Sequence, residues 1–314
     1  MKNIRTITLN PVFDLHYRVP DFRAGVENLV VSATREAGGK GVNTSRALAA
    51  NGVDNLAYVV LGCENGGEFA DCLKRDGVPC RCFPAEGRIR EGITVHPDAG
   101  PETRLAVNTF RLPESTFSRL EQTLLAEDLP TLLVSFSGRI PTGFDKERVL
   151  TLLQRLRDGG AAVVADSASF TAEDLRRLHP WFIKPNAQET LTLWGRAPET
   201  PEDAVACAQG MAASGVSENV LLSLGGDGAA YAGSDGAYLL RVPPLTAPVS
   251  TIGAGDSVVA GLLAGAAQGL PMEACLRLAM AYGTAACMTP GTRPPRPEDV
   301  AAVLPRVLIE KTTG

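Results

Sequence analysis

The octapeptide STIGAGDS, residues 250–257, combines residue types that suit phosphoryl transfer, and an apolar run with helical spacing follows it. Gly253 and Gly255 permit a tight turn that presents the first amides of the helix to an anion, and the helix dipole strengthens the attraction. Asp256, in the first turn, is then placed to accept a proton from a hydroxyl that attacks the bound phosphoryl group. The alternative is an ordinary helix N-terminus, where glycine and aspartate are common.

A second glycine-rich stretch, AGGKGVN at residues 37–43, precedes another helical pattern. Its three glycines permit close backbone approach to a ligand, Lys40 adds a positive charge, and Asn43 is both a donor and an acceptor. Asp14 follows the first predicted strand, at the position where α/β folds build ligand sites. A carboxylate beside an asparagine suits the binding of sugar hydroxyls. The alternative is a flexible turn before a helix.

Two further motifs follow later strands. In KPNAQE, residues 184–189, Asn186 and Glu189 have the spacing of a capping box. The same pair could organise the hydration shell of Mg²⁺, which takes few protein ligands and several waters, with Lys184 as a phosphate contact. The stretch SLGGDGA, residues 223–229, is either a tight turn or the support of a nucleotide.

The elements that must position these motifs alternate along the chain. Short apolar runs predict strands covered on both faces, and amphipathic stretches between them predict helices, so we expect a mostly parallel sheet with helices on both sides. The predicted strands are Thr6–Leu9, Leu56–Leu61, Thr131–Phe136, Ala161–Ala165, Trp181–Lys184 and Asn219–Leu224. The predicted helices are Val42–Ala50, Glu68–Arg75, Asp145–Arg157, Asp256–Gln268, Met272–Met288 and Pro297–Val307.

Two regions contain strands without helices between them. Leu15–Val19 and Leu29–Thr34 form the first region, and Gly92–His96 and Thr103–Phe110 flank a turn in the second. These four strands predict a small second sheet, which would be too thin to be stable alone and must lean on the core or on another subunit. Glycine-rich turns after Asn219 predict an antiparallel edge to the main sheet.

Composition narrows the class of protein. Of the 314 residues 45% are apolar, which supports a large core, and the formal charge of −5 argues against a broad nucleic-acid surface. The most apolar run, Val258–Ala267, is too short for a membrane span. Seven cysteines and three histidines show no zinc-binding spacing. We therefore expect a cytoplasmic protein with reduced, packed cysteines and no nucleic-acid or membrane partner.

Together and in this order, the motifs resemble those of the ribokinase/PfkB family of carbohydrate kinases. The matching stretches are TIGAGD (251–256), GGKGVN (38–43), NAQE (186–189) and SLGGDGA (223–229). TITLNP (6–11) with Asp14, KPN (184–186) and GTAA (283–286) resemble the phosphosugar branch: the 1-phosphofructokinases, tagatose-6-phosphate kinases and minor 6-phosphofructokinases. ENLV (27–30) and WFIK (181–184) are most similar to the 1-phosphofructokinases.

The resemblance implies a ribokinase-like three-layer α/β sandwich with a mostly parallel central sheet. One kinase domain would span residues 1–314, with a β-sheet lid formed by two insertions at about 12–36 and 88–111. It also implies ATP and Mg²⁺ as cofactors, a sugar phosphate as acceptor, and a homodimer joined through the lids.

Site roles follow from the resemblance residue by residue. Asp256 would be the general base, and the amides of Gly253, Ala254 and Gly255 the anion hole. The acceptor side would comprise Asp14, Gly38, Gly39, Lys40, Asn43, Arg90, Ser137 and Arg139. The nucleotide side would comprise Lys184, Asn186, Ser223, Gly225, Gly228 and Thr284, and the metal would be held by Asn186 and Glu189 through water.

One departure from the family concerns the acceptor. The branch usually reads Ser-Gly-Ser-Leu-Pro where this chain has SGRIP, residues 137–141, so Arg139 replaces a small polar residue. The expected reaction is ATP-dependent phosphorylation of a ketohexose monophosphate, fructose 1-phosphate to fructose 1,6-bisphosphate. The alternatives are tagatose-6-phosphate kinase or 6-phosphofructokinase activity, or a sugar-phosphate sensor without catalysis. An intact Asp256 favours the enzyme over the sensor.

Overall fold

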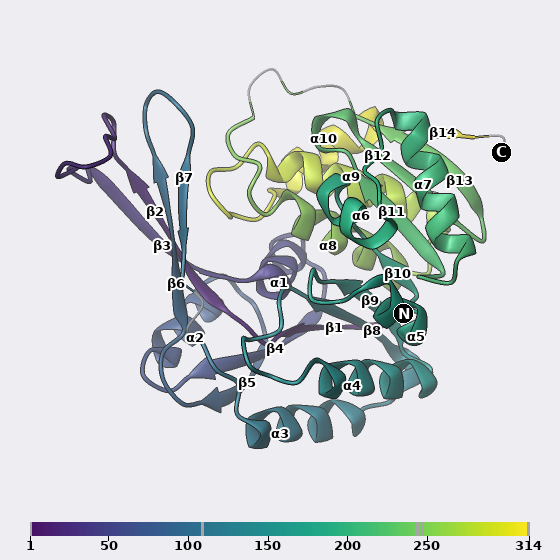
Figure 1. Ribbon diagram of the computed structural model, residues 1–314, viewed down its shortest axis with the longest axis horizontal. Coiled ribbons are helices and arrows are strands. Elements are labelled where there is room, and N and C mark those ends of the chain that lie inside the picture. Colours follow the sequence, from purple (N-terminus) through teal and green to yellow (C-terminus); the bar gives the residue numbers. More distant parts are fainter. Residues whose placement is uncertain (1, 108–109, 243–244, 246–247, 313–314) are drawn as a thin grey trace.

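The main body of the molecule is built on a ten-stranded sheet (Figure 1). The computed structural model describes residues 2–107, 110–242, 245 and 248–312. From β5 to β11 neighbouring strands are parallel, and the last three strands are antiparallel. In sheet order the strands are β14 (Leu308–Lys311), β13 (Gly236–Arg241), β12 (Ala229–Gly233), β11 (Asn219–Ser223), β10 (Phe182–Ile183), β9 (Ala162–Asp166), β8 (Leu132–Ser137), β1 (Asn3–Thr8), β4 (Asn55–Gly62) and β5 (Cys80–Ala85).

Helices cover both faces of this sheet, so the body has three layers. Central strands such as β8 are buried along their whole length, which explains their apolar runs without polar alternation. One apolar cluster packs α2 (Gly66–Arg75), α3 (Glu114–Leu125), α4 (Lys146–Asp158), α5 (Ala172–Leu178) and α7 (Pro201–Ala213) on one face. A second cluster packs α1 (Lys40–Ala50), α8 (Ala254–Ala267), α9 (Met272–Ala286) and α10 (Pro297–Val303) on the other. The short helix α6 (Ala187–Trp194) follows β10.

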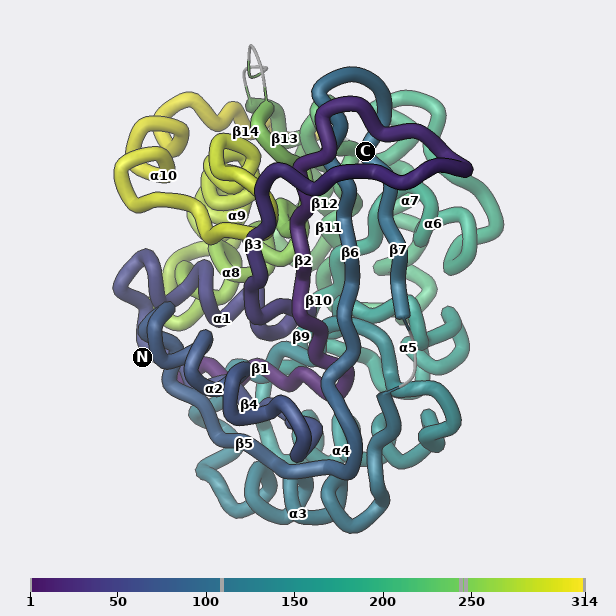
Figure 2. Tube along the Cα trace, turned by 90° about the vertical axis from the view of Figure 1, so that its left-hand side faces the viewer, coloured from purple at the N-terminus to yellow at the C-terminus, as the bar shows by residue number. Residues whose placement is uncertain are grey.

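A separate four-stranded sheet, here called the lid, projects from this body. Figure 2 shows its strands side by side in the order β3, β2, β6, β7. β2 pairs with β3 antiparallel and with β6 parallel, so the two segments predicted from the sequence do form one sheet. The lid strands are β2 (Val12–Arg18), β3 (Ser32–Gly38), β6 (Arg90–His96) and β7 (Thr103–Ala106).

Parts of the element prediction are wrong. Leu29, Val30 and Val31 lie outside any strand and are exposed, because β3 begins at Ser32. β7 ends at Ala106, and residues 108–109 of the predicted strand Thr103–Phe110 lie outside the described residues. The last predicted helix ends at Val303 and gives way to a 3₁₀ turn and an edge strand. The elements β5, α3, α5 and β14 were not predicted; β5 is an edge strand with partly exposed residues.

Two expectations about the surface can be compared with the structure. All seven cysteines are free, but Cys63 and Cys82 are exposed rather than packed. Across the residues that the structure describes, no helix is both long and apolar enough to cross a membrane.

Candidate active site

The candidate site lies at the carboxyl edge of the parallel strands. β8 ends at Ser137, β9 ends at Asp166, and Lys184 follows β10 directly. Because the carboxyl ends of parallel strands meet at one edge of a sheet, polar side chains there converge from distant parts of the sequence. A backbone bond from Gly138 to the carbonyl of Asp166, 3.0 Å, joins two of these ends.

Asp256 lies in the first turn of α8, which begins after Gly253. Gly253 has φ of +80°, a left-handed conformation that glycine adopts without strain, and this turns the chain into the helix. The Asp256 side chain is only 7% exposed, and its Oδ2 accepts a 2.9 Å hydrogen bond from Asn43 Nδ2. The Thr44 hydroxyl also donates to the Asp256 carbonyl at 3.2 Å. Two glycine-rich helix starts 213 residues apart therefore form one site.

The electrostatic surroundings of Asp256 suit a general base. Burial raises the pKa of Asp256 to about 6, and the negative charge of Asp166 adds to this effect. Lys40, the Asn43 hydrogen bond and Lys184 act in the opposite direction on the pKa. A carboxylate with a pKa near 6 is mostly ionised at neutral pH and is a stronger base than an ordinary aspartate.

Lys184 lies against the start of α8. It is 5% exposed, and a Cβ placed on Gly255 would lie 3.1 Å from its Nζ. The first turn of a helix leaves backbone N–H groups without partners inside the helix, although the Ala254 amide makes a long 3.4 Å bond to the Thr251 carbonyl. A buried ammonium beside these amides makes the start of α8 attractive to a phosphate.

Lys40 bridges two carboxylates near Asp256. Its Nζ lies 3.1 Å from Asp166 Oδ1 and 3.7 Å from Glu189 Oε1. Burial lowers the pKa of Lys40, but Asp166, Glu189 and Asp256 raise it more strongly, so the side chain is held as a cation. Asp166 was not predicted from the sequence. It directly follows a predicted strand, which is the same signal that singled out Asp14.

On the lid side, Asp14 is 4% exposed and lies against the end of β3. A Cβ on Gly38 would overlap Asp14 Oδ2, so only glycine fits at that position. Arg104 from β7 reaches Asp14 Oδ1 at 3.3 Å. Burial raises the pKa of Asp14, whereas Arg104 and then Arg90 lower it. Arg104 is a second residue of the site that sequence analysis missed, since no motif contains it.

Arg90 begins β6 and is held at the base of the lid. Its Nε donates to Asn10 Oδ1 at 2.9 Å, and its other nitrogens donate to the carbonyls of Asn10 and Val107, both at 3.4 Å. Burial lowers the pKa of Arg90; Asp14 opposes this effect, and the nearby charges of Arg104 and Arg139 reinforce it. Arg104 and Arg139 therefore both lie within electrostatic reach of Arg90, and Arg104 and Arg90 lie within reach of Asp14.

Residues expected on the nucleotide side are only partly joined by contacts. Asn186 and Ser223 form a β-bridge, and the Ser223 amide donates to the Pro185 carbonyl at 2.9 Å. Gly225 and Gly228 both have positive φ and turn the chain between β11 and β12. Thr284 lies on α9 one residue after Gly283, which packs against the start of α8. Among the described residues, no side-chain hydrogen bond or ion pair joins Thr284 to the others.

Asn186 and Glu189 do form the predicted capping box. Asn186 Oδ1 accepts from the Glu189 amide at 2.8 Å, and Glu189 Oε2 accepts from the Asn186 amide at 3.0 Å. The second carboxylate oxygen of Glu189 is the one that faces Lys40. Capping therefore uses one oxygen and leaves the other directed into the site.

Fold and site together define a carbohydrate kinase. The model of the pfkB family of carbohydrate kinases matches residues 8–299, and the chain belongs to this family. PfkB kinases use ATP. The chain is phosphofructokinase-like within that family.

Relatives with two activities are about equally similar to the chain. The 1-phosphofructokinase of Rhodobacter capsulatus is 31% identical over 313 residues, 98% of this chain and 97% of that protein. The ATP-dependent 6-phosphofructokinase isozyme 2 of Escherichia coli (strain K12) is 30% identical over 295 residues, 93% of this chain and 95% of that protein. The structure of phosphofructokinase-2 from Escherichia coli in complex with substrates and products has a TM-score of 0.89 at 28% identity and covers 96% of this chain and 98% of its own.

Proposed function

We propose that the protein transfers the γ-phosphoryl group of ATP to a hydroxyl of a ketohexose monophosphate, with fructose 1-phosphate as the preferred acceptor and fructose 1,6-bisphosphate as product. The observation that carries the choice of a phosphosugar is the concentration of arginines here: Arg104 and Arg139 lie within electrostatic reach of Arg90, and Arg104 pairs with Asp14. The guanidinium groups outnumber the carboxylate that pairs with them, and the excess of positive charge suits a phosphate monoester dianion. A neutral sugar has no use for this excess.

Asp256 acts as the general base in this proposal. It accepts the proton of the acceptor hydroxyl as the new O–P bond forms and the bond between the γ-phosphorus and the bridging oxygen of ATP breaks, releasing ADP. The Asn43 amide orients the carboxylate. Lys184 and the amides at the start of α8 stabilise the charge on the transferred group. Burial of Asp256 excludes water, which would otherwise compete as acceptor.

The residues present fit a magnesium ion. Asp166 Oδ2 is buried and has no hydrogen-bond partner in the part of the chain that the structure describes, and Glu189 Oε1 lies 3.7 Å from Lys40 Nζ. Hard carboxylate oxygens suit Mg²⁺, which would supply charge neutralisation on the phosphates when bound. Asp166 and Glu189 would hold it, with Asn186 contributing through water as the motif suggests. Lys40 would share these carboxylates with the ion.

A homodimer joined through the lids is part of the same proposal. The segment that joins β2 to β3 exposes several large apolar side chains, of which Leu29 is 80% exposed and Val31 52%. A thin sheet is stabilised by a second layer, and a second lid would supply one and cover these side chains. A structure of phosphofructokinase-2 from Escherichia coli is described as its tetrameric inhibited form.

A substrate panel tests the acceptor. ADP release is measured with fructose 1-phosphate, fructose 6-phosphate, tagatose 6-phosphate, free fructose and ribose, and the acceptors are compared by kcat/KM. We expect the phosphorylated ketohexoses to exceed the free sugars by orders of magnitude, with fructose 1-phosphate first. Efficient turnover of free fructose or ribose would overturn the phosphosugar assignment, and a higher kcat/KM for another phosphosugar would overturn the preference.

A further inference from the structure

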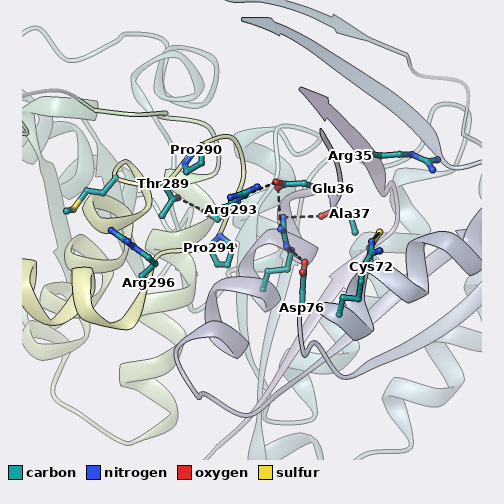
Figure 3. Close-up of a pocket in the computed structure, with 13 residues that line it drawn as sticks. Arg35, Glu36, Ala37, Cys72, Asp76, Thr289, Pro290, Arg293, Pro294 and Arg296 are labelled. Atoms are coloured by element: carbon teal, nitrogen blue, oxygen red, sulfur yellow. Dashed lines mark hydrogen bonds and ion pairs between the residues drawn. The ribbon is translucent and has the colours of Figure 1, made fainter. Parts of the chain in front are cut away.

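A second cavity lies outside the candidate active site, between the base of the lid and the segment that follows α9. It has a volume of about 560 Å³, within the range of sites that bind small organic molecules. Figure 3 shows its two walls: Arg35, Glu36 and Cys72 on one side, and Arg293 and Arg296 on the other. None of the residues predicted for catalysis or for substrate or nucleotide binding lines it.

Arginine dominates the lining of this cavity. Five arginine side chains face two carboxylates. The arginines are Arg35, Arg46, Arg75, Arg293 and Arg296, and the carboxylates are Glu36 and Asp76. The lining thus carries three more positive than negative charges.

Both lining carboxylates are already engaged by buried Arg46. Its Nε donates to Asp76 Oδ2 at 2.6 Å, and a terminal nitrogen donates to Glu36 Oε2 at 3.3 Å. The other terminal nitrogen donates to the carbonyls of Ala37 and Thr292, each at 3.2 Å. Arg46, whose side chain is 5% exposed, therefore contacts both carboxylates of the lining and balances one of their two negative charges.

Of the four remaining arginines, Arg35 is paired with Glu68 and Glu91 outside the lining, and the other three keep donors for a ligand. Within the described ranges, the only side-chain contact of exposed Arg75 is with Cys72 Sγ at 2.9 Å, so its guanidinium has no carboxylate partner. Arg293 shares Glu36 at 3.4 Å through Nε alone. Arg296 binds Asp299 through Nε at 2.6 Å. A guanidinium has five N–H donors, so each of these side chains has several left.

Arg75 also stands in the last turn of α2, where a cation complements the helix dipole. Interaction with the helix dipole explains the presence of Arg75, but it does not explain why Arg293 and Arg296 lie on the opposite wall of the cavity. Guanidinium groups on two walls suit an anion with several charged oxygens, because planar forks bind carboxylate and phosphate groups two bonds at a time. A simple monovalent ion would leave most of the cavity unfilled.

We propose that this cavity binds a small organic polyanion bearing phosphate or carboxylate groups, at a site separate from the one that performs phosphoryl transfer. A ligand in this cavity would lie against the base of the lid. Glu36 and Ala37 belong to β3, and the Glu36 carboxylate accepts from the Thr292 hydroxyl at 2.9 Å. An anion that attracts Arg293 competes with Glu36 at this junction.

Calorimetric titration of the full-length protein in metal-free buffer tests the proposal. The probes are pyrophosphate for phosphate groups and tricarballylate for carboxylate groups, and the stronger binder identifies the preferred chemistry. We expect at least one to bind with a submillimolar Kd, and expect Arg75→Gln with Arg296→Gln to weaken it at least tenfold, since two charge-assisted contacts are lost. Arg119→Gln, at an exposed arginine on α3, is the matched control and should leave the Kd unchanged.

Arg90→Ala separates this site from the active site. It removes a proposed acceptor contact but touches nothing in the cavity, so the affinity for the probe should persist. Binding that is lost in Arg90→Ala and kept in the Arg75/Arg296 double variant would overturn the proposal, as would no binding of either probe to the wild type. Thermal unfolding and kinase assays establish that the double variant is folded; the single Arg75→Gln variant replaces it if it is not.

Discussion

The carboxyl edge of the large sheet and the lid meet at the same site but are built differently. At the sheet edge, Asp256, Lys184 and Asp166 are all buried and are fixed by strand ends and a helix start. In the lid, the first four residues of β3 are exposed, and Arg104 reaches Asp14 with a side chain that is 52% exposed. The difference suggests that the chemistry depends on the packed core, whereas acceptor choice depends on a thin sheet that a few substitutions can alter.

The largest effect on activity should come from a substitution at the buried edge of the large sheet. Asp256→Asn keeps the shape and the Asn43 contact but removes the proton acceptor, so kcat should fall by roughly 10²–10⁴-fold. ATP affinity should change little. Steady-state kinetics and nucleotide titration measure both, and near-normal turnover would exclude Asp256 as the base.

The same variant should be more stable than the wild type. Because the folded-state pKa of Asp256 is raised to about 6, the ionised carboxylate destabilises the fold above that pH. The gain in Tm on substitution by asparagine should therefore be full above about pH 6 and disappear below about pH 4. A variant that loses both activity and stability at pH 8 would point to a structural role instead.

On the lid side, Arg90→Ala should remove most of the preference for phosphosugars. A charge-assisted contact is worth roughly 1.5–3 kcal/mol, or tenfold to more than a hundredfold in kcat/KM. The ratio of kcat/KM for fructose 1-phosphate to that for free fructose measures the effect. An unchanged ratio would show that Arg90 does not bind the phosphate of the acceptor sugar.

Arg139→Ser restores the residue usual in the family and serves as the companion variant. If Arg139 contacts the phosphate, use of phosphosugars weakens; if it only narrows the pocket, the range of accepted sugars widens.

Substitutions at the exposed apolar side chains of the lid region test the proposed dimer. Leu29→Asp with Val31→Asp places two charges among the exposed apolar side chains, and like charges brought together across a two-fold interface repel. We expect the proposed dimer through the lids to weaken at least tenfold, as measured by sedimentation velocity. The matched control is Leu308→Asp, at an exposed leucine on β14 far from the lid, which should leave the association unchanged.

The site residues that could be predicted from the sequence are those that belong to local motifs. The motif residues at the sheet edge, Asp256, Asn43 and Lys40, were identified because their spacing is local: a glycine turn, then a helix start. Asp166 follows a predicted strand as Asp14 does, but none of the motifs contains it, and the order of the strands in the sheet brings it to its neighbours in the site. Arg104 was missed because its position depends on the register of β7 on β6, which the sequence does not encode locally.

The error at residues 29–31 is instructive in another way. The apolar run Leu29, Val30 and Val31 was interpreted as the first half of a strand, Leu29–Thr34, because a short apolar run is typical of a strand. The structure exposes these residues. The proposed interface with a second chain would account for both the composition and the exposure, and a single sequence does not separate this case from a core strand.

A smaller effect concerns the charge of Lys40. This ammonium lowers the pKa of Asp256, so its removal by Lys40→Met should raise that pKa above about 6. As the base must be ionised, the acidic limb of the pH profile of kcat should move to higher pH. Lys40→Arg retains the charge and should leave the midpoint near that of the wild type. If the midpoint of the acidic limb is identical in both variants, the charge of Lys40 does not influence the pKa of Asp256.

The smallest expected effect on stability is at Glu189, where two roles share one side chain. Glu189→Gln preserves a carbonyl oxygen for the capping bond to the Asn186 amide, so the loss in stability should stay within about 1 kcal/mol. The oxygen that faces Lys40 loses its charge, which weakens any hold on a water-bound cation. The magnesium concentration needed for half-maximal activity should therefore rise while the KM for the sugar stays close to its original value.

Glu189→Ala completes the argument, because it removes both roles at once. If Glu189 serves the metal as well as the cap, the glutamine variant shifts the magnesium requirement alone, and the alanine variant shifts it while also lowering Tm. If Glu189 is only a cap, the glutamine variant behaves like the wild type in both assays and the alanine variant loses stability alone. Magnesium titrations of activity and thermal unfolding of the two variants separate these outcomes, since the capping bond and the free oxygen lie on different atoms of the same carboxylate.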